Sequence, residues 1–248
     1  MDPVTLVLVL LAGFAASFLS GIAGGGGGMI SLPALLFLGL PPATAIATGR
    51  FGGLGGGAPH VYKFSKAGKI AMEYALPLTI AGVLGTIIGT KILLDFDKTL
   101  LSKTIGILLL VMLPLIFTKP AFGMKRKKIR KNGKILGYLA YFVVEIYDGF
   151  VSIAAGILAT YALIYTLGLT YLEANATDKL PALVNSVLAV GIYAYYGLVD
   201  YPAGIVLLAG MLAGGWAGAH FAIKKGNEFV KLAFSLVVVA SAAKILFF

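Results

Sequence analysis

Long apolar runs cover almost the whole of this chain, and they decide what it can fold into. Ten runs, separated by brief polar breaks, lie at roughly 4–22, 29–40, 44–62, 73–94, 100–117, 135–152, 155–168, 174–196, 203–222 and 229–247. A helix needs about 20 mostly apolar residues to cross a bilayer. Strands of a membrane barrel would alternate polar and apolar residues, and these runs do not. The sequence therefore predicts an all-α polytopic membrane protein of about 8–10 helices, some of them short or broken.

The composition leaves no room for a sizeable soluble domain. Of 248 residues, 59% are hydrophobic and 12% charged, whereas about a quarter of a soluble domain is charged. The net charge of +10 does not indicate a nucleic-acid partner, because eight of the twenty basic residues lie between Lys119 and Lys134. A basic cluster between two apolar runs is typical of a cytoplasmic loop. We expect a multi-pass protein of the cell (cytoplasmic) membrane, surrounded by the lipid bilayer.

The residues that enzymes commonly need are scarce. The chain has no cysteine, and its two histidines, His60 and His220, do not belong to a His-Glu-x-x-His pattern. Nucleophilic catalysis needs a nucleophile with a base, and metal catalysis needs a cluster of ligands. We therefore expect no enzyme activity, no cofactor and no metal site. The start, Met1-Asp2-Pro3, lacks the positive region of a signal peptide, which predicts a retained first helix.

The second half of the chain repeats the first. Leu38-Gly39-Leu40 falls on Leu167-Gly168-Leu169, 129 positions later, and this offset then holds without gaps. The matched pairs are Ala45 and Ala174, Ala47 and Ala176, Thr48 and Thr177, Arg50 and Lys179, Gly68 and Gly197, Gly85 and Gly214, and Gly89 and Gly218. Chance similarity between apolar helices would supply the alanines and glycines, but rarely a cation at the same step.

Each copy holds five membrane segments, and an odd number makes the second copy enter the membrane inverted. Loop charges agree with this: if the basic loop is cytoplasmic, the lysines at 63–69 and 224–231 lie inside and the aspartates at 95–97 and 200 lie outside, as the positive-inside rule requires. We expect residues 1–118 to form the first transmembrane repeat, 119–134 a basic cytoplasmic linker and 135–248 the second repeat.

The second and seventh segments are too short to span. At 1.5 Å per residue they reach roughly 20 Å, against a hydrocarbon core of about 30 Å. They are predicted to be half-helices or re-entrant pieces.

Arg50 and Lys179 are the leading candidates for a binding site. Each lies about six residues, or roughly 10 Å, into the third segment of its repeat, and inversion brings the two toward the midplane from opposite sides. A cation at that depth usually faces a bundle interior or a cavity. Two of them in matching places indicate an anion site. In the alternative, Arg50 reaches the membrane surface, or each cation pairs with a carboxylate, such as Asp178 beside Lys179.

Helix breaks near these cations give a second argument. Pro41-Pro42 precedes the first of the two helices, Pro181 interrupts the second, and glycines at 52–57 weaken the first. Broken helices expose backbone N–H groups that attract anions, and they point to transporter sites. The predicted substrate-binding residues are Arg50, Lys179, Thr48, Thr177, Asn175, Asp178, Asn185, Gly25, Gly26 and Gly27. Threonine and asparagine could instead satisfy freed backbone groups, and the glycine run at 24–28 could instead serve helix packing.

Three further residues are candidates for proton coupling. Glu145 and Asp148 are carboxylates near the end of the sixth apolar segment, and carboxylates inside a membrane often relay protons. His220 could titrate near neutral pH, although a lone histidine is more often structural. A salt bridge from a carboxylate to Arg50 or Lys179 is an equal alternative. The pairs Gly85/Gly89 and Gly214/Gly218 have helical spacing and predict close helix packing.

In both halves these residues resemble the sulfite exporter TauE/SafE family of anion permeases. The first half matches through residues 21–28, Gly-Ile-Ala followed by five glycines, through Pro33, and through Leu38 to Thr48. The second half matches through Leu167-Gly168-Leu169, through Glu173 to Lys179, and through the turn from Gly197 to Asp200. The resemblance covers almost the full chain. The Glu-Ala-Asn-Ala-Thr stretch is specific, whereas glycine runs alone would not be.

The resemblance implies secondary transport of sulfite, sulfonates or related small organic anions, in most cases outward. It therefore supplies a substrate class, a small anionic partner, which charge and spacing could not. The two cation sites differ, because Gly49 precedes Arg50 whereas Asp178 precedes Lys179. A non-transporting membrane component that assembles with partners is the alternative, and a homo-oligomer is compatible with either function.

Overall fold

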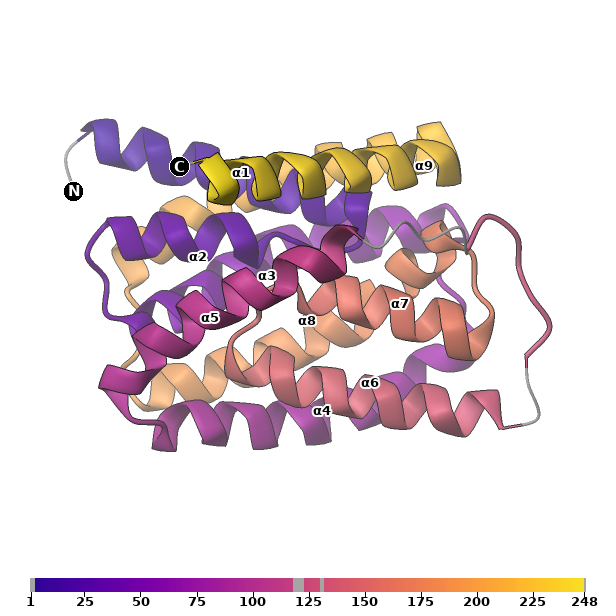
Figure 1. Ribbon diagram of the computed structural model, residues 1–248, viewed down its shortest axis with the longest axis horizontal. Coiled ribbons are helices and arrows are strands. Elements are labelled where there is room, and N and C mark those ends of the chain that lie inside the picture. The colour runs from indigo at the N-terminus through magenta and orange to yellow at the C-terminus, as the bar shows by residue number, and fades with distance from the viewer. Residues whose placement is uncertain (1–2, 118–122, 130–131, 248) are drawn as a thin grey trace.

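Every regular element in the described part of the chain is an α-helix. The computed structural model describes residues 3–117, 123–129 and 132–247, and side-chain surroundings for 3–108, 123–129 and 132–226. The helices are α1 (Pro3–Ala23), α2 (Gly28–Phe37), α3 (Pro42–Lys66), α4 (Met72–Asp95), α5 (Lys98–Phe117), α6 (Gly133–Phe150), α7 (Ala155–Leu167), α8 (Tyr171–Tyr195) and α9 (Tyr201–Phe247) (Figure 1). Gly226, at φ 73°, divides α9 into two arms. The predicted all-α class is confirmed.

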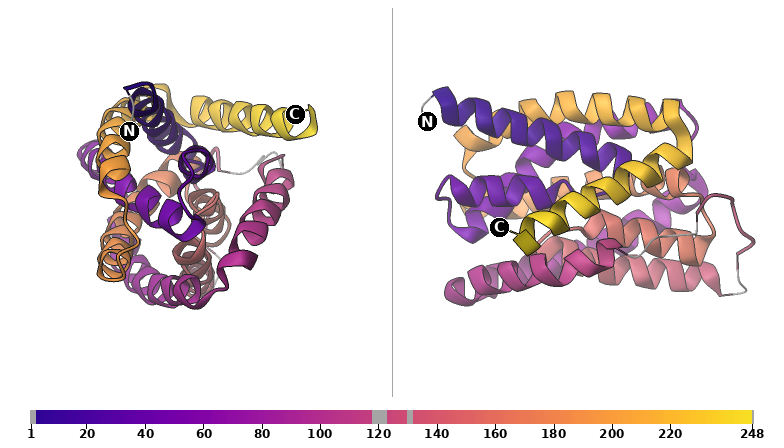
Figure 2. Two further views of the ribbon diagram at one scale, coloured as in Figure 1. Left: turned by 90° about the vertical axis from the view of Figure 1, so that its left-hand side faces the viewer. Right: turned by 45° about the horizontal axis from the view of Figure 1, so that its top comes forward.

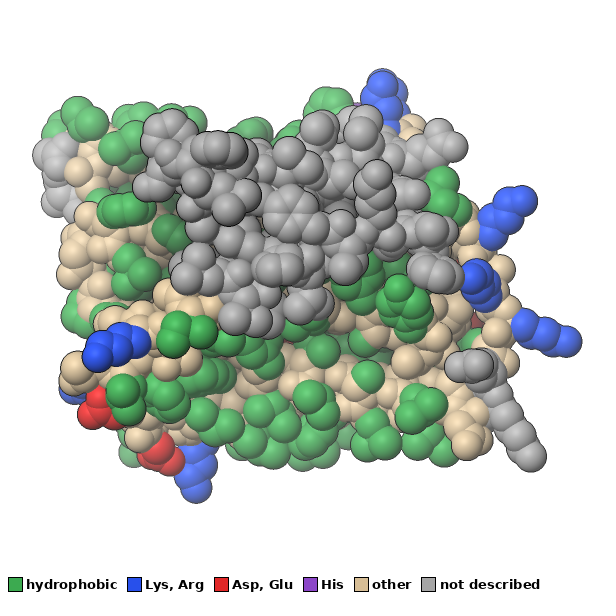
Figure 3. Space-filling view, in the orientation of Figure 1, with side chains coloured by type: hydrophobic (Ala, Val, Ile, Leu, Met, Phe, Trp, Pro, Cys, Tyr) green, Lys and Arg blue, Asp and Glu red, His purple; other side chains and the backbone are tan. Residues whose placement is uncertain are grey.

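The helices run roughly along one direction and form a bundle suited to a membrane. Three stretches in the described ranges are long and apolar enough to cross a bilayer, namely Pro3–Ala23, Met72–Asp95 and Tyr201–Gly226. The pair α7 and α8, bent by 118°, adds a fourth if it is counted as one span. Figure 3 shows charged side chains at the two ends of the molecule and hydrophobic ones between them. This distribution is expected of a protein whose middle faces lipid.

The second and seventh segments are short, as predicted. Helix α2 has 10 residues and α7 has 13, which gives lengths of about 15 and 20 Å. In Figure 1, α2 lies in the left half of the molecule and α7 in the right half. The two short helices therefore occupy opposite ends of the bundle.

Long helices pair between the halves through glycines. Helix α1 packs along α9, and α4 packs along α6; the left panel of Figure 2 looks along the helices and shows α1 beside the first arm of α9. A Cβ at Gly85 would lie 2.6 Å from the Phe142 carbonyl oxygen, and one at Gly218 would lie 2.9 Å from the Phe18 Cα. Gly89 and Gly214 face backbone in the same way. The predicted close packing is confirmed.

The predicted breaks in the third segment of each half are wrong. Helices α3 and α8 run without interruption for 25 residues each. Pro42 occupies the first turn of α3, where its missing N–H would have no helical partner in any case. Pro181 removes one hydrogen bond from the interior of α8, but the packed bundle keeps the helix intact. The chain breaks instead before α2 and before α7.

The basic linker is described only in part, because residues 118–122 and 130–131 lie outside the described ranges. Its described piece, 123–129, is attached to the turn that joins α7 and α8. The Lys127 N–H donates to the Gly168 carbonyl at 2.8 Å, and the Tyr171 N–H donates to the Gly123 carbonyl at 2.7 Å. The division into two repeats, their inversion and the cytoplasmic location of this linker stay predictions.

Candidate functional site

Two loops from different halves of the chain meet where the short helices begin. One loop joins α1 to α2, and the other joins α6 to α7. A Cβ at Gly25 would lie 2.5 Å from the Ile157 backbone nitrogen, and one at Gly156 would lie 2.7 Å from the Gly24 carbonyl oxygen. Only glycine allows the two backbones to come this close. The N-terminal ends of α2 and α7 therefore lie next to each other.

Both loops use left-handed backbone conformations at alternate residues. In the first loop these are Gly24 at φ 80° and Gly26 at φ 85°; in the second they are Ser152 at φ 62° and Ala154 at φ 57°. The first N–H groups of an α-helix have no partner inside the helix, and the helix dipole adds positive potential there. Two such ends in contact create a region that favours an anion.

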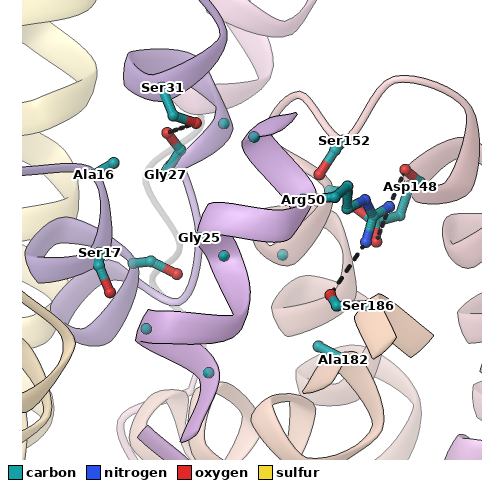
Figure 4. Close-up of a pocket in the computed structure, with 18 of the residues that line it drawn as sticks. Ala16, Ser17, Gly25, Gly27, Ser31, Arg50, Asp148, Ser152, Ala182 and Ser186 are labelled. Carbon is teal, nitrogen blue, oxygen red and sulfur yellow. Dashed lines mark hydrogen bonds and ion pairs between the residues drawn. The ribbon is translucent and has the colours of Figure 1, made fainter. Parts of the chain in front are cut away.

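A cavity of about 180 Å³ opens beside this contact. Residues from α1, α2, α3, α6, α7, α8 and α9 line it together with both loops (Figure 4). Gly25, Gly26 and Gly27, which were predicted to be site residues, lie in its wall. Its ionisable lining residues are Arg50, His60, Glu145, Asp148, Asp178 and Lys179. The two predicted cations thus share one cavity, although they come from different halves of the sequence.

Arg50 is bound by groups of the second half. Its Nη2 atom lies 2.6 Å from Asp148 Oδ2 and also donates to the Asp148 carbonyl oxygen. Its Nη1 atom donates to Ser186 Oγ at 3.4 Å. Its Nε is buried and has no hydrogen-bond partner among the described residues. The guanidinium is therefore held in place by an ion pair, and its Nε–H group is left without a partner among the described residues.

Lys179 is bound mainly by groups of the first half. Its Nζ atom donates to Ser20 Oγ and to the Gly24 carbonyl oxygen, both at 3.3 Å. The carboxylate of its sequence neighbour Asp178 lies 3.8 Å from Nζ and also accepts from the Tyr141 hydroxyl at 3.1 Å. Lys179 therefore faces neutral oxygens and has a looser ion pair than Arg50.

The remaining carboxylate of the cavity is Glu145. It is 2% exposed, and its Oε2 accepts from Asn185 Nδ2 at 2.9 Å and from the Thr86 hydroxyl at 3.3 Å. Glu145 and Asp148 lie in the cavity wall, whereas His220 is exposed and does not line it. The structure therefore brings together two of the three residues predicted for proton coupling.

The paired threonines do not line the cavity, because each hydroxyl holds the other half's fourth helix. Thr48 Oγ1 accepts from the Asp200 N–H, and Thr177 Oγ1 accepts from the Ala71 N–H, both at 2.9 Å. Asp200 and Ala71 directly precede α9 and α4. The two contacts follow the sequence repeat, because Thr48 and Thr177 are 129 positions apart and so are Ala71 and Asp200.

The predicted asparagines also lie outside the cavity wall. Asn175 Nδ2 donates to the Gly21 carbonyl oxygen at 2.9 Å, which joins α8 to the end of α1. Asn185 is bound to Glu145 and therefore orients a cavity carboxylate without lining the cavity itself. Both side chains are fully buried.

Sequence reasoning missed several residues of the wall. Ser20 and Ser186 hold the two cations, and Ser152 lines the cavity from the α6–α7 loop. His60 is 3% exposed, and its Nε2 has no hydrogen-bond partner among the described residues. The signal from position was weak: His60 and Arg50 are ten residues apart on α3, which places them about 80° apart around the helix.

Comparison with known proteins agrees with the resemblance seen in the sequence. The family described as Sulfite exporter TauE/SafE matches residues 9–245. A probable membrane transporter protein of Haemophilus influenzae is 29% identical over 227 residues, which cover 91% of this chain and 88% of the relative. The probable membrane transporter protein YfcA of Escherichia coli K12 is 25% identical over 248 residues, covering 100% of this chain and 91% of the relative. No solved structure matches.

Proposed function

This chain belongs to the sulfite exporter TauE/SafE family, and we propose that it is a secondary transporter of small anions. Its substrates would be sulfite, sulfonates or related organic anions, carried across the cytoplasmic membrane by alternating access. The printed names of its relatives, probable membrane transporter proteins, support a transport function.

The observation that carries the proposal is the shared cavity. One cation from each half, Arg50 and Lys179, lines it, and the N-terminal ends of two short helices meet in its wall. Cations buried in a membrane bundle mark ion pathways, and helix N-termini favour negative charge. Four separate sources of positive potential thus surround one space.

The size of the cavity supports small substrates. Its volume is about 180 Å³, whereas pockets for drug-sized ligands measure about 300–1,000 Å³. A protein cavity of about 150 Å³ holds benzene. A sulfite ion or a short organic sulfonate therefore fits, and a large metabolite does not.

The carboxylates of the wall give a basis for coupling to protons. Asp148 forms an ion pair with the Arg50 guanidinium. An anion can therefore bind to the terminal nitrogens of Arg50 only when this ion pair opens. A proton on Asp148 would weaken the pair, because a neutral carboxyl attracts a cation less than a carboxylate does. Glu145 lies in the same wall and could accept a proton as well. In this proposal proton uptake and anion binding occur together, and exposed His220 takes no part.

The packing of the two halves is compatible with alternating access. Helix α1 of the first half packs along α9 of the second, while α4 packs along α6. This exchange of partners is what two inverted repeats around a central site would produce. Rocking of one half against the other would then expose the site to each membrane face in turn.

A non-transporting assembly component is less well supported. Such a protein would offer its glycine-rich helix faces to partners, but Gly85, Gly89, Gly214 and Gly218 already contact helices of this chain. The ionisable residues, moreover, converge on an internal cavity.

Flux into proteoliposomes tests the proposal. The variants are Lys179→Gln and the double variant Arg50→Met with Asp148→Asn, which removes both charges of the buried pair and leaves no unpaired carboxylate. Each should lower saturable sulfite or methanesulfonate uptake by about tenfold or more, because a hydrogen bond to a charged group contributes about 1.5–3 kcal/mol. Gel filtration and thermal unfolding in detergent check that each variant is folded.

The matched control is Lys91→Gln. Lys91 is an exposed lysine of α4 that does not line the cavity, so that flux should stay at the parental level. If the folded Lys179→Gln and double variants also transport at the parental rate, the site assignment is wrong. If the parental protein shows no saturable anion flux, transport itself is wrong.

A further inference from the structure

We infer that Ser152 binds substrate directly and that, with the free N–H group of Arg50, it forms the subsite for an oxyanion head group. This inference rests on the proposed function and deepens it, because it names a selectivity residue and the part of the substrate that it contacts.

The first observation is the backbone of Ser152. Its φ of 62° lies in the left-handed region, and Ala154 at φ 57° is the other non-glycine residue of the described chain found there. The α1–α2 loop has glycines, Gly24 and Gly26, at its two positive-φ positions. Glycine adopts this conformation without strain, whereas a side chain does not. Strained residues of this kind are concentrated at functional sites, where the side chain is needed.

The second observation separates Ser152 from Ala154. Ser152 lines the cavity, whereas Ala154 is buried and does not. Ala154 is the N-cap residue of α7, and its methyl side chain makes no cap hydrogen bond. Figure 4 shows the Ser152 hydroxyl pointing toward Arg50 at the cavity. The unusual backbone of Ser152 therefore presents a hydroxyl group to the same space as the cation.

The third observation is the free donor on Arg50. Asp148 and Ser186 bind the two terminal nitrogens of the guanidinium, but the buried Nε has no partner among the described residues. An unpaired buried donor costs free energy. A ligand that accepts from it would remove this cost. Arg50 therefore points independently to an acceptor bound at this place.

Together these groups offer two donors at separate positions. One oxygen of a sulfonate, sulfite or carboxylate group would accept from Arg50 Nε–H, and a second oxygen would accept from the Ser152 O–H. An anion with at least two oxygens can use both donors in one orientation. The subsite therefore fixes the orientation of the head group, and any organic tail points into the rest of the cavity.

Three variants test the inference by radiolabelled methanesulfonate uptake into proteoliposomes. Ser152→Gly and Ala154→Gly both relieve left-handed strain and should raise the melting temperature by a few degrees. Only Ser152→Gly removes the hydroxyl, so that only it should raise the KM for methanesulfonate, by about tenfold. Ser152→Ala removes the hydroxyl without relieving the strain, and it should raise the KM to a similar extent with no gain in melting temperature.

The outcomes are distinct. A KM unchanged in both Ser152→Gly and Ser152→Ala, with parental transport intact, overturns the role of Ser152 and leaves the proposed function standing. A KM raised equally by Ala154→Gly also overturns it, because loop rigidity would then be the cause. A parental protein that transports no methanesulfonate and no sulfite overturns both proposals. A more stable Ser152→Gly protein with weaker substrate binding supports the inference.

Discussion

Arg50 and Lys179 occupy equivalent places in the two halves, yet their surroundings differ. Each is bound by groups of the opposite half, so the pattern of the repeat is preserved. Arg50 has a carboxylate at 2.6 Å across the interface, whereas Lys179 reaches only a hydroxyl and a carbonyl there, at 3.3 Å. The carboxylate next to Lys179 belongs to its own helix and lies 3.8 Å away.

One sequence repeat can therefore supply two kinds of cation. Arg50 is fixed in position by an ion pair and offers its unpartnered Nε–H group, so it orients a ligand. Lys179 has weaker neutral partners, and its ammonium can exchange them for an anion at little cost. We therefore expect Arg50 to matter more for stability and Lys179 to matter mainly for binding.

Breaking the Arg50 ion pair should lower the free energy of unfolding more than any other change proposed below. Arg50→Ala leaves Asp148, which is 13% exposed, without its ion-pair partner, and such a change costs up to about 3–5 kcal/mol. Lys179→Ala should lower the free energy of unfolding less, by about 1–3 kcal/mol, because Asp178 keeps its hydrogen bond to Tyr141. Thermal unfolding in detergent measures both. Equal losses of unfolding free energy in the two variants would mean that Arg50 and Lys179 contribute to stability in the same way.

A second, smaller effect concerns the loop beside Lys179. Gly25→Ala places a Cβ against the Ile157 backbone and should cost about 1–3 kcal/mol through overpacking. It should also reduce flux, because Gly24 would move away from Lys179. Gly191→Ala is the matched control: its φ, like that of Gly25, lies outside the left-handed region, but a Cβ there would meet nothing within 4 Å. A larger loss for Gly191→Ala would contradict the backbone contact.

The smallest effect is expected for Thr48 and Thr177, whose hydrogen bonds are equivalent in the two halves. Thr48→Val and Thr177→Val each remove one hydrogen bond to the start of the other half's fourth helix. Each should lower stability by about 1 kcal/mol, to the same extent, with flux per folded protein unchanged. Selective loss of flux in either variant would return that threonine to the substrate site.

The fold class and the central pair were readable from the sequence. Continuous apolar runs dictate membrane helices, and the short second and seventh segments follow from length alone. Arg50 and Lys179 could be found because a cation inside an apolar helix needs a polar environment. Each of these inferences depends on local features of the chain or on its internal repeat.

The rest depended on contacts between distant parts of the chain. Thr48 and Thr177 bind backbone groups 152 and 106 residues away, and no local pattern reveals such partners. The helices are apolar on nearly all sides, so their periodicity does not show which face lines a cavity. Ser152 was overlooked because a positive φ at a non-glycine residue has no sequence signal, and the continuity of α8 through Pro181 depends on its neighbours.

The ion pair of Arg50 also sets a limit on affinity. An internal carboxylate that already occupies the guanidinium competes with every anion that enters, and the apparent dissociation constant rises in inverse proportion to the fraction of molecules in which Arg50 is free. Anions present at trace concentration would therefore leave the protein almost empty. A site built in this way responds to abundance: it begins to fill only once its substrate has accumulated.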